Sequence, residues 1–239
     1  PARAGGSMSG LFYPPCYALL SGGKDSKVCV SVLAEADKLL GCVALETGVS
    51  TPDWKEWLIE DCRKLGWPLQ FFKTQVDYDD YVKKHGFPGP GRHGWIMNRL
   101  KGRGIQQFKK FHPGQVLASG VRHFESKRRE HGTRPMSIWE GVPIICPIYD
   151  WTTDEVWAHF HAKGFERAPA YSTLQISGDC LCGAFAQEGE ADALRFHYPE
   201  VAARFDAISE DIKDVHPKCY QWGWGASRPK VKTGKQRAI

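Results

Sequence analysis

A short polar loop is the first candidate for chemistry in this sequence. It consists of Ser21, Gly22, Gly23, Lys24, Asp25 and Ser26. Glycines let backbone N–H groups approach an anion closely, and the serine hydroxyls and the lysine ammonium group add donors for phosphate oxygens. Asp25 repels an anion, so we expect it to cap the following helix or to help hold Mg²⁺. Together these residue types predict a phosphate-binding loop.

The segments on either side of the loop strengthen this prediction. Residues 16–20 form a short apolar run typical of a buried strand, and residues 27–40 have apolar side chains at helical spacing before Gly41. A helix that begins at the loop points its positive end at a bound anion. The loop shares only its Gly-Lys core with the GxxxxGK[ST] motif, which excludes a P-loop NTPase.

Strand and helix patterns alternate through the first two thirds of the chain. Apolar strands are expected at residues 42–45, 69–72, 116–119 and 142–145, and helices at residues 52–64, 106–111 and 152–163. This alternation requires right-handed crossovers between parallel strands. We therefore expect a Rossmann-like α/β domain over residues 8–163, with a mainly parallel five-stranded sheet and helices on both faces. A small C-terminal extension with a Cys-rich turn would follow over residues 164–226.

Three segments, in their order along the chain, resemble a known enzyme superfamily. The loop matches the SGGxDS signature of the PP-loop ATP pyrophosphatases, the adenine nucleotide α-hydrolases. Glu46, Thr47 and Gly48 resemble a stretch that lies by the adenosine in the phosphoadenylyl-sulfate (PAPS) reductase branch. The block from Gly120 through Arg122 to Arg129 resembles the Gly-x-Arg-x-x-Glu-Ser-x-x-Arg block of the same branch. The resemblance covers residues 17–157 and implies the HUP-type fold.

The resemblance also implies roles for the loop and for the end of the fourth strand. The loop would cradle the phosphates of ATP bound with Mg²⁺, and Lys24 would offset the charge that builds on the leaving group. Ser119 and Gly120 would contact the nucleotide, since ligands of such sheets lie at the carboxyl ends of the strands. Arg122 and Arg129 would face phosphate or sulfate oxygens, which suit planar guanidinium groups.

The sequence departs from the reductase branch at the catalytic thiol. Reductases of this type carry the attacking cysteine in a C-terminal Glu-Cys-Gly motif, and no such motif occurs here. Without a thiolate the reduction has no first step, so reduction of PAPS or of adenylyl sulfate (APS) is disfavoured. The late cysteine Cys219 keeps that alternative open.

Four cysteines in the second half are candidate metal ligands. They are Cys146, Cys180, Cys182 and Cys219. Four thiols are enough for a [4Fe–4S] cluster or a zinc site, and the resemblance to cluster-containing relatives places iron–sulfur ahead of zinc. Their spacing is irregular, so thiols without any ligand role are the alternative. The absence of a secretory signal argues against disulfides.

Charge and hydropathy limit which partners and which cellular location we expect. Residues 227–239 contain five basic residues and no acid, within a chain of net charge +5. This tail is either an arm that contacts tRNA or DNA or a solvated terminus. No apolar run reaches the roughly 18 residues that span a bilayer. We expect no membrane association and a cytoplasmic protein, with a homodimer left open, and residues 1–7 look vector-derived.

Three functions follow from these patterns. The first is an ATP pyrophosphatase that adenylylates or thiolates an acceptor, which tRNA or DNA would supply in analogy with thiolation enzymes of the superfamily. The second is a PAPS or APS reductase. The third is a non-catalytic nucleotide-binding accessory protein of a phage, defence or type IV CRISPR system. Reductase-like proteins of such systems resemble this chain in combining an intact nucleotide motif with an absent reductase thiol.

Overall fold

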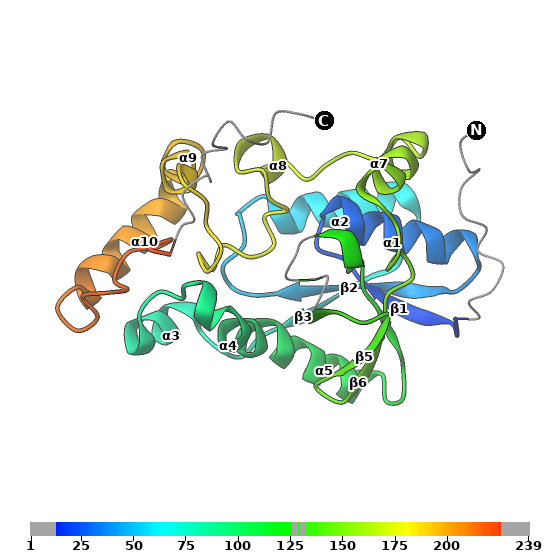
Figure 1. Ribbon diagram of the computed structural model, residues 1–239, viewed down its shortest axis with the longest axis horizontal. Coiled ribbons are helices and arrows are strands. Elements are labelled where there is room, and N and C mark those ends of the chain that lie inside the picture. Colours follow the sequence, from blue (N-terminus) through cyan, green and yellow to red (C-terminus); the bar gives the residue numbers. More distant parts are fainter. Residues whose placement is uncertain (1–12, 126–128, 130–131, 226–239) are drawn as a thin grey trace, which may run out of the picture.

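A six-stranded sheet forms the centre of the computed structural model, which describes residues 13–125, 129 and 132–225. The strand order is β3-β2-β1-β4-β6-β5 (Figure 1). The strands are β1 (Cys16–Leu19), β2 (Leu39–Glu46), β3 (Leu69–Lys73), β4 (Leu117–Ala118), β5 (Met136–Trp139) and β6 (Val142–Ile145). All neighbouring pairs are parallel except β5 with β6. The α/β class and the mainly parallel sheet expected from the sequence are therefore confirmed.

Strand β5 is the one strand that the sequence patterns did not predict. It forms an antiparallel hairpin with β6 at the edge of the sheet. The turn consists of Glu140 and Gly141, whose φ angles are +51° and +73°, as a tight hairpin turn requires. Met136 and Ile138 are exposed, so β5 lacks the buried face whose alternation reveals a strand in a sequence.

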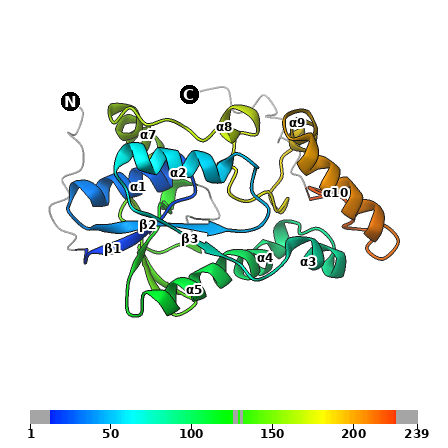
Figure 2. The ribbon, with the colours of Figure 1, turned by 180° about the vertical axis from the view of Figure 1, so that it is seen from behind.

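Helices cover both faces of the sheet (Figures 1 and 2). On one face lie α1 (Lys24–Glu35), α2 (Trp54–Leu65) and α7 (Thr153–Ala162). On the other face lie α3 (Tyr78–His85), the 3₁₀ turn η1 (Pro90–Arg92), α4 (His93–Met97), the π-helical turn η2 (Asn98–Gly102) and α5 (Arg103–Phe111). Thr152 and Glu155 form the expected capping box at the start of α7. None of the helices in the described part of the chain is long and apolar enough to cross a membrane.

Apolar side chains on α1, α2 and α7 pack together on one face of the sheet. Val30, Leu58 and Phe160 are among the buried members of this cluster, and each such side chain contributes about 1.5–3 kcal/mol. The face under α5 has its own cluster, in which Phe108 packs edge-on against Tyr17. These two clusters hold β1 and α1 in one position, and with them the loop between them.

The residues after 164 form α8 (Ala170–Thr173), α9 (Glu190–His197) and α10 (Pro199–Ile212). Their core is continuous with α3, because Phe205 of α10 packs against Tyr78 and Phe87. The indole of Trp222 stacks on Phe205 with ring centroids 5.7 Å apart, so this tryptophan serves packing. The extension also lies against the carboxyl ends of β1 and β2, near Gly23 and Thr47.

Candidate functional site

The predicted phosphate loop connects β1 to α1 and has the geometry of an anion cradle. Gly22 has a φ of +88°, which favours glycine, and a Cβ there would lie 3.1 Å from the Trp57 ring. The hydroxyl oxygens of Ser21 and Ser26 are 3.2 Å apart. Trp54 Nε1 donates a hydrogen bond to the Ser21 carbonyl oxygen at 2.8 Å, which anchors the loop to α2. The cradle is thus held by the core beneath it.

The N-terminus of α1 is not capped by a side chain. Gly23 stands at the cap position in an extended conformation, with φ −76° and ψ 152°, and as a glycine it supplies no side-chain cap. A twelve-residue helix with an uncapped start presents backbone N–H groups and the positive end of its dipole. This arrangement favours an anion at Gly23 and Lys24.

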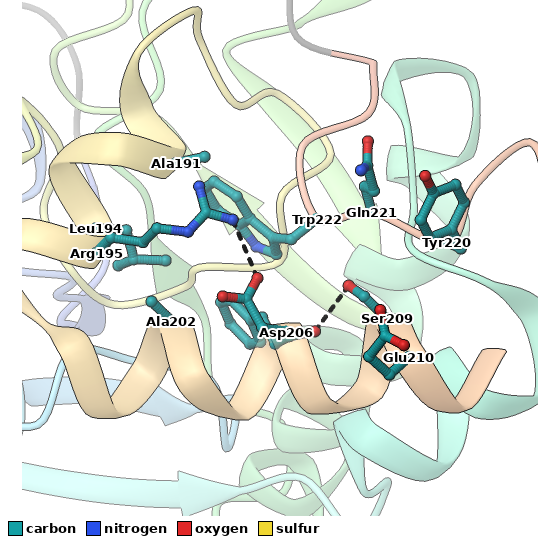
Figure 3. A pocket seen from close by; sticks show the side chains of 11 residues that line it. Ala191, Leu194, Arg195, Ala202, Asp206, Ser209, Glu210, Tyr220, Gln221 and Trp222 are labelled. Carbon is teal, nitrogen blue, oxygen red and sulfur yellow. Dashed lines mark hydrogen bonds and ion pairs between the residues drawn. The ribbon is translucent and has the colours of Figure 1, made fainter. Parts of the chain in front are cut away.

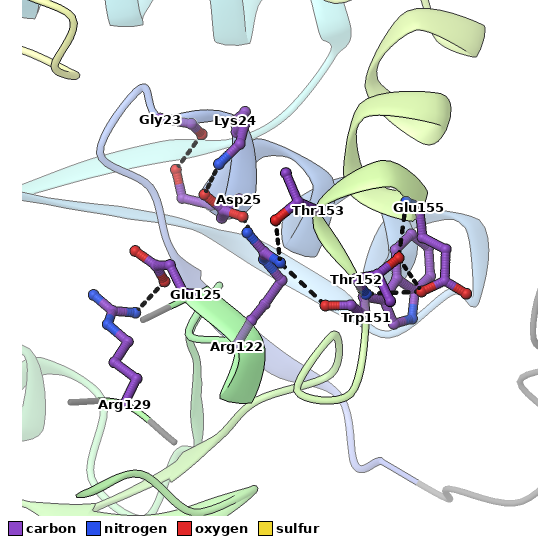
Figure 4. A network of polar contacts seen from close by, with 11 residues as sticks. Gly23, Lys24, Asp25, Arg122, Glu125, Arg129, Trp151, Thr152, Thr153 and Glu155 are labelled. Carbon is purple, nitrogen blue, oxygen red and sulfur yellow. Dashed lines mark hydrogen bonds and ion pairs between the residues drawn. The ribbon is translucent and has the colours of Figure 1, made fainter. Parts of the chain in front are cut away.

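Asp25 has neither of the two roles expected from the sequence. It does not cap α1, because it lies in the first turn after the cap position. Its Oδ2 accepts a hydrogen bond from Lys24 Nζ at 2.6 Å, and its Oδ1 accepts one from Arg122 Nε at 2.6 Å (Figure 4). Because both carboxylate oxygens are engaged by cations, Asp25 does not fit as a ligand for Mg²⁺.

Arg122 is a buried partner of Asp25 rather than an exposed phosphate clamp. Its side chain is 1% exposed, and its Nη1 donates to the Trp151 carbonyl oxygen at 3.1 Å and to Thr153 Oγ1 at 3.4 Å (Figure 4). The guanidinium group joins the end of β4 to the starts of α1 and α7. In this structure the donors of Arg122 are directed at protein acceptors, and its contact with phosphate oxygens stays a prediction.

Arg129 forms an ion pair of 2.6 Å with Glu125, four residues earlier (Figure 4). The side chain is partly exposed, unlike that of Arg122. The resemblance that assigned Arg129 to phosphate or sulfate oxygens is not tested by this contact, so that role stays a prediction. The intervening residues 126–128 of the motif lie outside the described residues.

Gly120 is the point where β4 approaches α1 most closely. A Cβ at this position would lie 2.6 Å from the backbone carbonyl of Asp25 and 2.7 Å from the nitrogen of Ser26. The preceding residue, Ser119, is half-buried, and its N–H donates to the Ile145 carbonyl oxygen at 2.8 Å. Gly120 therefore lies beside the phosphate loop, and nucleotide contact by Ser119 and Gly120 stays a prediction.

Gly120→Ala should therefore lower the free energy of unfolding by about 1–3 kcal/mol, since the extra methyl group forces backbone segments apart. Urea denaturation followed by circular dichroism measures this change. Gly91→Ala is the matched control, because a Cβ on Gly91 would meet nothing within 4 Å. Equal midpoints for the two variants would contradict the close approach of β4 and α1.

The end of β2 supplies the second group of predicted site residues. Glu46 pairs with Lys55 at 3.0 Å. Thr47 is fully buried, and its hydroxyl donates to the Asp179 carbonyl oxygen at 3.0 Å. Gly48 has a φ of +74°, and its carbonyl oxygen accepts a hydrogen bond from Arg204. The residues expected beside the adenosine thus also bind the C-terminal extension to the sheet.

The extension places side chains over the phosphate loop that the sequence patterns did not identify. The Tyr171 hydroxyl lies at the start of α1, since a Cβ on Gly23 would lie 3.3 Å from its oxygen. Burial raises the pKa of Tyr171, so it stays a neutral donor and acceptor. Ser177 Oγ donates to Asp179 Oδ1 at 2.5 Å, and Lys101 Nζ pairs with Asp179 Oδ2 at 2.5 Å. In the sequence, the polar run Ser177-Gly178-Asp179 was the feature that could have indicated side chains of the extension near the loop.

The four predicted metal-ligand cysteines do not come together. Among the described residues, which include all four, no group of three or more candidate ligands is present. Cys146 is buried directly after β6, where its N–H donates to the Pro135 carbonyl oxygen, and Cys219 Sγ lies at the end of α3 near the His85 carbonyl oxygen. The four-thiol cluster or zinc site expected from the sequence therefore does not fit this structure.

Cys180 and Cys182 remain as a hydrogen-bonded pair of thiols next to Asp179. The hydrogen bond from the Cys180 thiol lowers the pKa of Cys182 to about 7, assisted by the backbone N–H of Ala184 and by Lys101. The same hydrogen bond, together with burial, raises the pKa of Cys180. The pair has the electrostatics of an activated thiol and its partner.

A separate cavity of about 340 Å³ lies between α9, α10 and residues 220–222 (Figure 3). Arg195 and Asp206 form an ion pair of 3.0 Å at its wall. Its lining includes Tyr220 and Trp222 but none of the residues predicted to bind the nucleotide. The cavity is therefore distinct from the phosphate loop.

Several solved structures are similar to this chain. The PAPS reductase from Candida auris, a phosphate complex, is 16% identical, with 65% of this chain and 75% of that chain covered and a TM-score of 0.48. The FMN adenylyltransferase of Candida glabrata in complex with ATP is 15% identical, with 67% and 50% covered and a TM-score of 0.49. The U34-tRNA thiolase NcsA from Methanococcus maripaludis with its [4Fe–4S] cluster is 16% identical, with 86% and 67% covered and a TM-score of 0.47.

No curated protein matches the sequence. The sequence profile of the phosphoadenosine phosphosulfate reductase domain, in contrast, matches residues 15–174. This match spans the phosphate loop, the end of β2, the Gly120 turn and α8, and it covers more than half of the 239 residues. The chain therefore belongs to the phosphoadenosine phosphosulfate reductase domain family.

Proposed function

We propose that this protein is an ATP pyrophosphatase that adenylylates an acceptor and releases pyrophosphate, with thiolation of the acceptor as the following step. The observation that carries the proposal is the uncapped start of α1, where the glycine loop, the Ser21 and Ser26 hydroxyls and Lys24 converge. Such a site suits the β- and γ-phosphates of a nucleotide. The resemblance of the loop to the SGGxDS signature of the PP-loop ATP pyrophosphatases supports ATP as the nucleotide.

Each group has a role in breaking the bond between the α-phosphorus and its bridging oxygen. The acceptor attacks the α-phosphorus, and pyrophosphate leaves with the electron pair of the broken bond. The backbone N–H groups and hydroxyls of the loop hold the departing phosphates, and Lys24 offsets their increasing charge. Residues after β2 and β4, among them Gly48 and Ser119, flank the loop and suit the nucleoside end. Mg²⁺ would arrive bound to the nucleotide phosphates, where it neutralises charge.

Product analysis tests this proposal directly. ATP labelled at the α-phosphorus is incubated with the protein and candidate acceptors, and the products are separated. We expect pyrophosphate together with AMP or an adenylylated acceptor. ADP and inorganic phosphate as the only products would contradict the proposal. Tight ATP binding without any turnover would favour the non-catalytic accessory role instead.

The thiol pair favours a second candidate function, the reduction of PAPS or APS. The Cys182 thiolate would attack the sulfonate sulfur, displacing the nucleotide and forming a thiosulfonate on Cys182. Cys180 would then attack the Cys182 sulfur, releasing sulfite and leaving a disulfide, which thioredoxin would reduce. These two thiols lie in the turn that follows Ser177 and Asp179, whereas Cys219 lies at the end of α3.

Sulfite release from PAPS or APS in the presence of reduced thioredoxin tests this second candidate. We expect Cys182→Ser to abolish the release and Cys219→Ser to leave it unchanged, because the pKa of Cys182 is lowered to about 7, whereas Cys219 lies at the end of α3. Release should increase as the pH rises through this pKa. Equal activity of wild-type protein and Cys182→Ser would remove the thiol route.

A further inference from the structure

The face of the molecule formed by α4, η2 and α5 is strongly basic. Between Asp80 and Glu125 the sequence contains nine Lys and Arg residues and no Asp or Glu. The structure places most of this stretch on the side of the sheet opposite α1 and α2 (Figures 1 and 2). We define the basic face by its exposed members, which are Arg92, Trp95, Arg99, Arg103, Lys109 and Lys110.

Trp95 is an exposed aromatic ring in the middle of these cations. It is 58% exposed, and its ring is held by the Arg99 guanidinium at 5.8 Å and by the edge of His85 at 5.9 Å. A single exposed apolar residue is common on protein surfaces and proves nothing alone. An indole presented between guanidinium groups, however, is the arrangement on which an unpaired base stacks.

A depression of about 300 Å³ adjoins this ring. It is lined by Trp95, Asn98, Arg99, Arg103, Gln106 and Glu140. Trp139 Nε1 donates to Asn98 Oδ1 at 3.1 Å, and the Gln106 amide donates to Glu140, so the turn between β5 and β6 forms its wall. Amide and carboxylate oxygens accept from the exocyclic amino groups of bases, and arginines bind phosphates. Glu140 is the one acidic side chain of the lining.

From these observations we infer that the basic face binds a single-stranded nucleic acid, with a base stacked on Trp95 and phosphates bound by Arg99 and Arg103. The inference names the class of acceptor for the proposed adenylylation and rests on that proposal for this role. Binding itself depends only on the basic face. The surface consists of described residues, and the basic tail at residues 227–239 lies outside them.

Fluorescence anisotropy with a labelled 20-nucleotide strand tests the inference in the full chain without ATP, with RNA and DNA probes as separate arms. We expect Trp95→Ala to weaken binding about 10-fold, as loss of one stacked base does. Arg99→Ala/Arg103→Ala should weaken it comparably and reduce the slope of log K against log salt by about 1.4, from about 0.7 for each lost phosphate contact.

The matched control removes two cations from the opposite side of the sheet. Arg63→Ala/Lys64→Ala changes the net charge equally on α2 and should leave the affinity and the salt slope unchanged. An equal loss of affinity in both double variants, or equal affinity of wild-type protein for a duplex of the same sequence, would overturn the inference. ATP binding by each variant is measured separately, so that failure of the nucleotide site and failure of the basic face are distinguished.

Discussion

Lys24→Ala should lower the rate of pyrophosphate release from ATP by about 100-fold, the effect of removing one group that stabilises transition-state charge. Lys24 is the first residue of α1, and its ammonium group pairs with Asp25 at 2.6 Å while its side chain keeps 17% exposure. An arriving polyphosphate competes for this charge, since the ammonium lies on a flexible stem. The loss should fall on kcat more than on KM, because the leaving-group charge develops only in the transition state.

The measurement is the initial rate of pyrophosphate release at several ATP concentrations. Lys213→Ala is the control, since Lys213 directly follows α10 and pairs only with Glu210 among the ion pairs of the described residues. It should retain the full rate. If Lys24→Ala released pyrophosphate as fast as the control, Lys24 would have no part in the chemistry.

Arg122→Ala should lower the free energy of unfolding of the nucleotide-free protein by about 3 kcal/mol. Removal of the guanidinium group leaves the Asp25 carboxylate, 17% exposed, without one of its two cations, and leaves the Trp151 carbonyl oxygen without a donor. Breaking a buried pair from one side is costly because the remaining charge stays poorly solvated. The change is measured by urea denaturation.

A double-mutant cycle separates the pair from other contacts of Arg122. Asp25→Asn combined with Arg122→Ala should be less destabilising than the sum of the single variants, because the two side chains interact directly. Arg63→Ala, which removes an exposed partner of Glu60, should cause no measurable change. Unchanged stability of Arg122→Ala together with lost ATP binding would instead restore the phosphate-clamp role implied by the family resemblance.

Local elements could be predicted from the sequence because neighbouring residues determine them. The strand before Ser21, the glycines of the loop and the helix after it are adjacent in the sequence. Five of the strands could be predicted from apolar runs. Strand β5 could not be predicted in this way, since its exposed face carries no alternation and its pairing depends on β6.

The roles of charged and sulfur-containing side chains depended on contacts between distant parts of the chain. Arg122 and Asp25 are 97 residues apart. Judged by residue type alone, the arginine suits a phosphate clamp and the aspartate suits a metal ligand as well as each suits the ion pair that they form. The four cysteines were grouped by number, yet the fold places Cys146 at the sheet and Cys219 at the end of α3. Residue type sets what a side chain can bind, whereas packing sets which partner it meets.

By itself, the sequence determined the phosphate loop between a strand and a helix, because glycine, serine and lysine at adjacent positions are sufficient to form a local anion cradle. Only the tertiary structure decided that Arg122 neutralises Asp25 and that Tyr171 and Ser177 of the C-terminal extension lie beside Gly23 of the loop. The physical reason is that ion pairs and hydrogen bonds act over a few ångströms. Residues separated by 100 or more positions meet only after the sheet, the helices and the C-terminal core have packed.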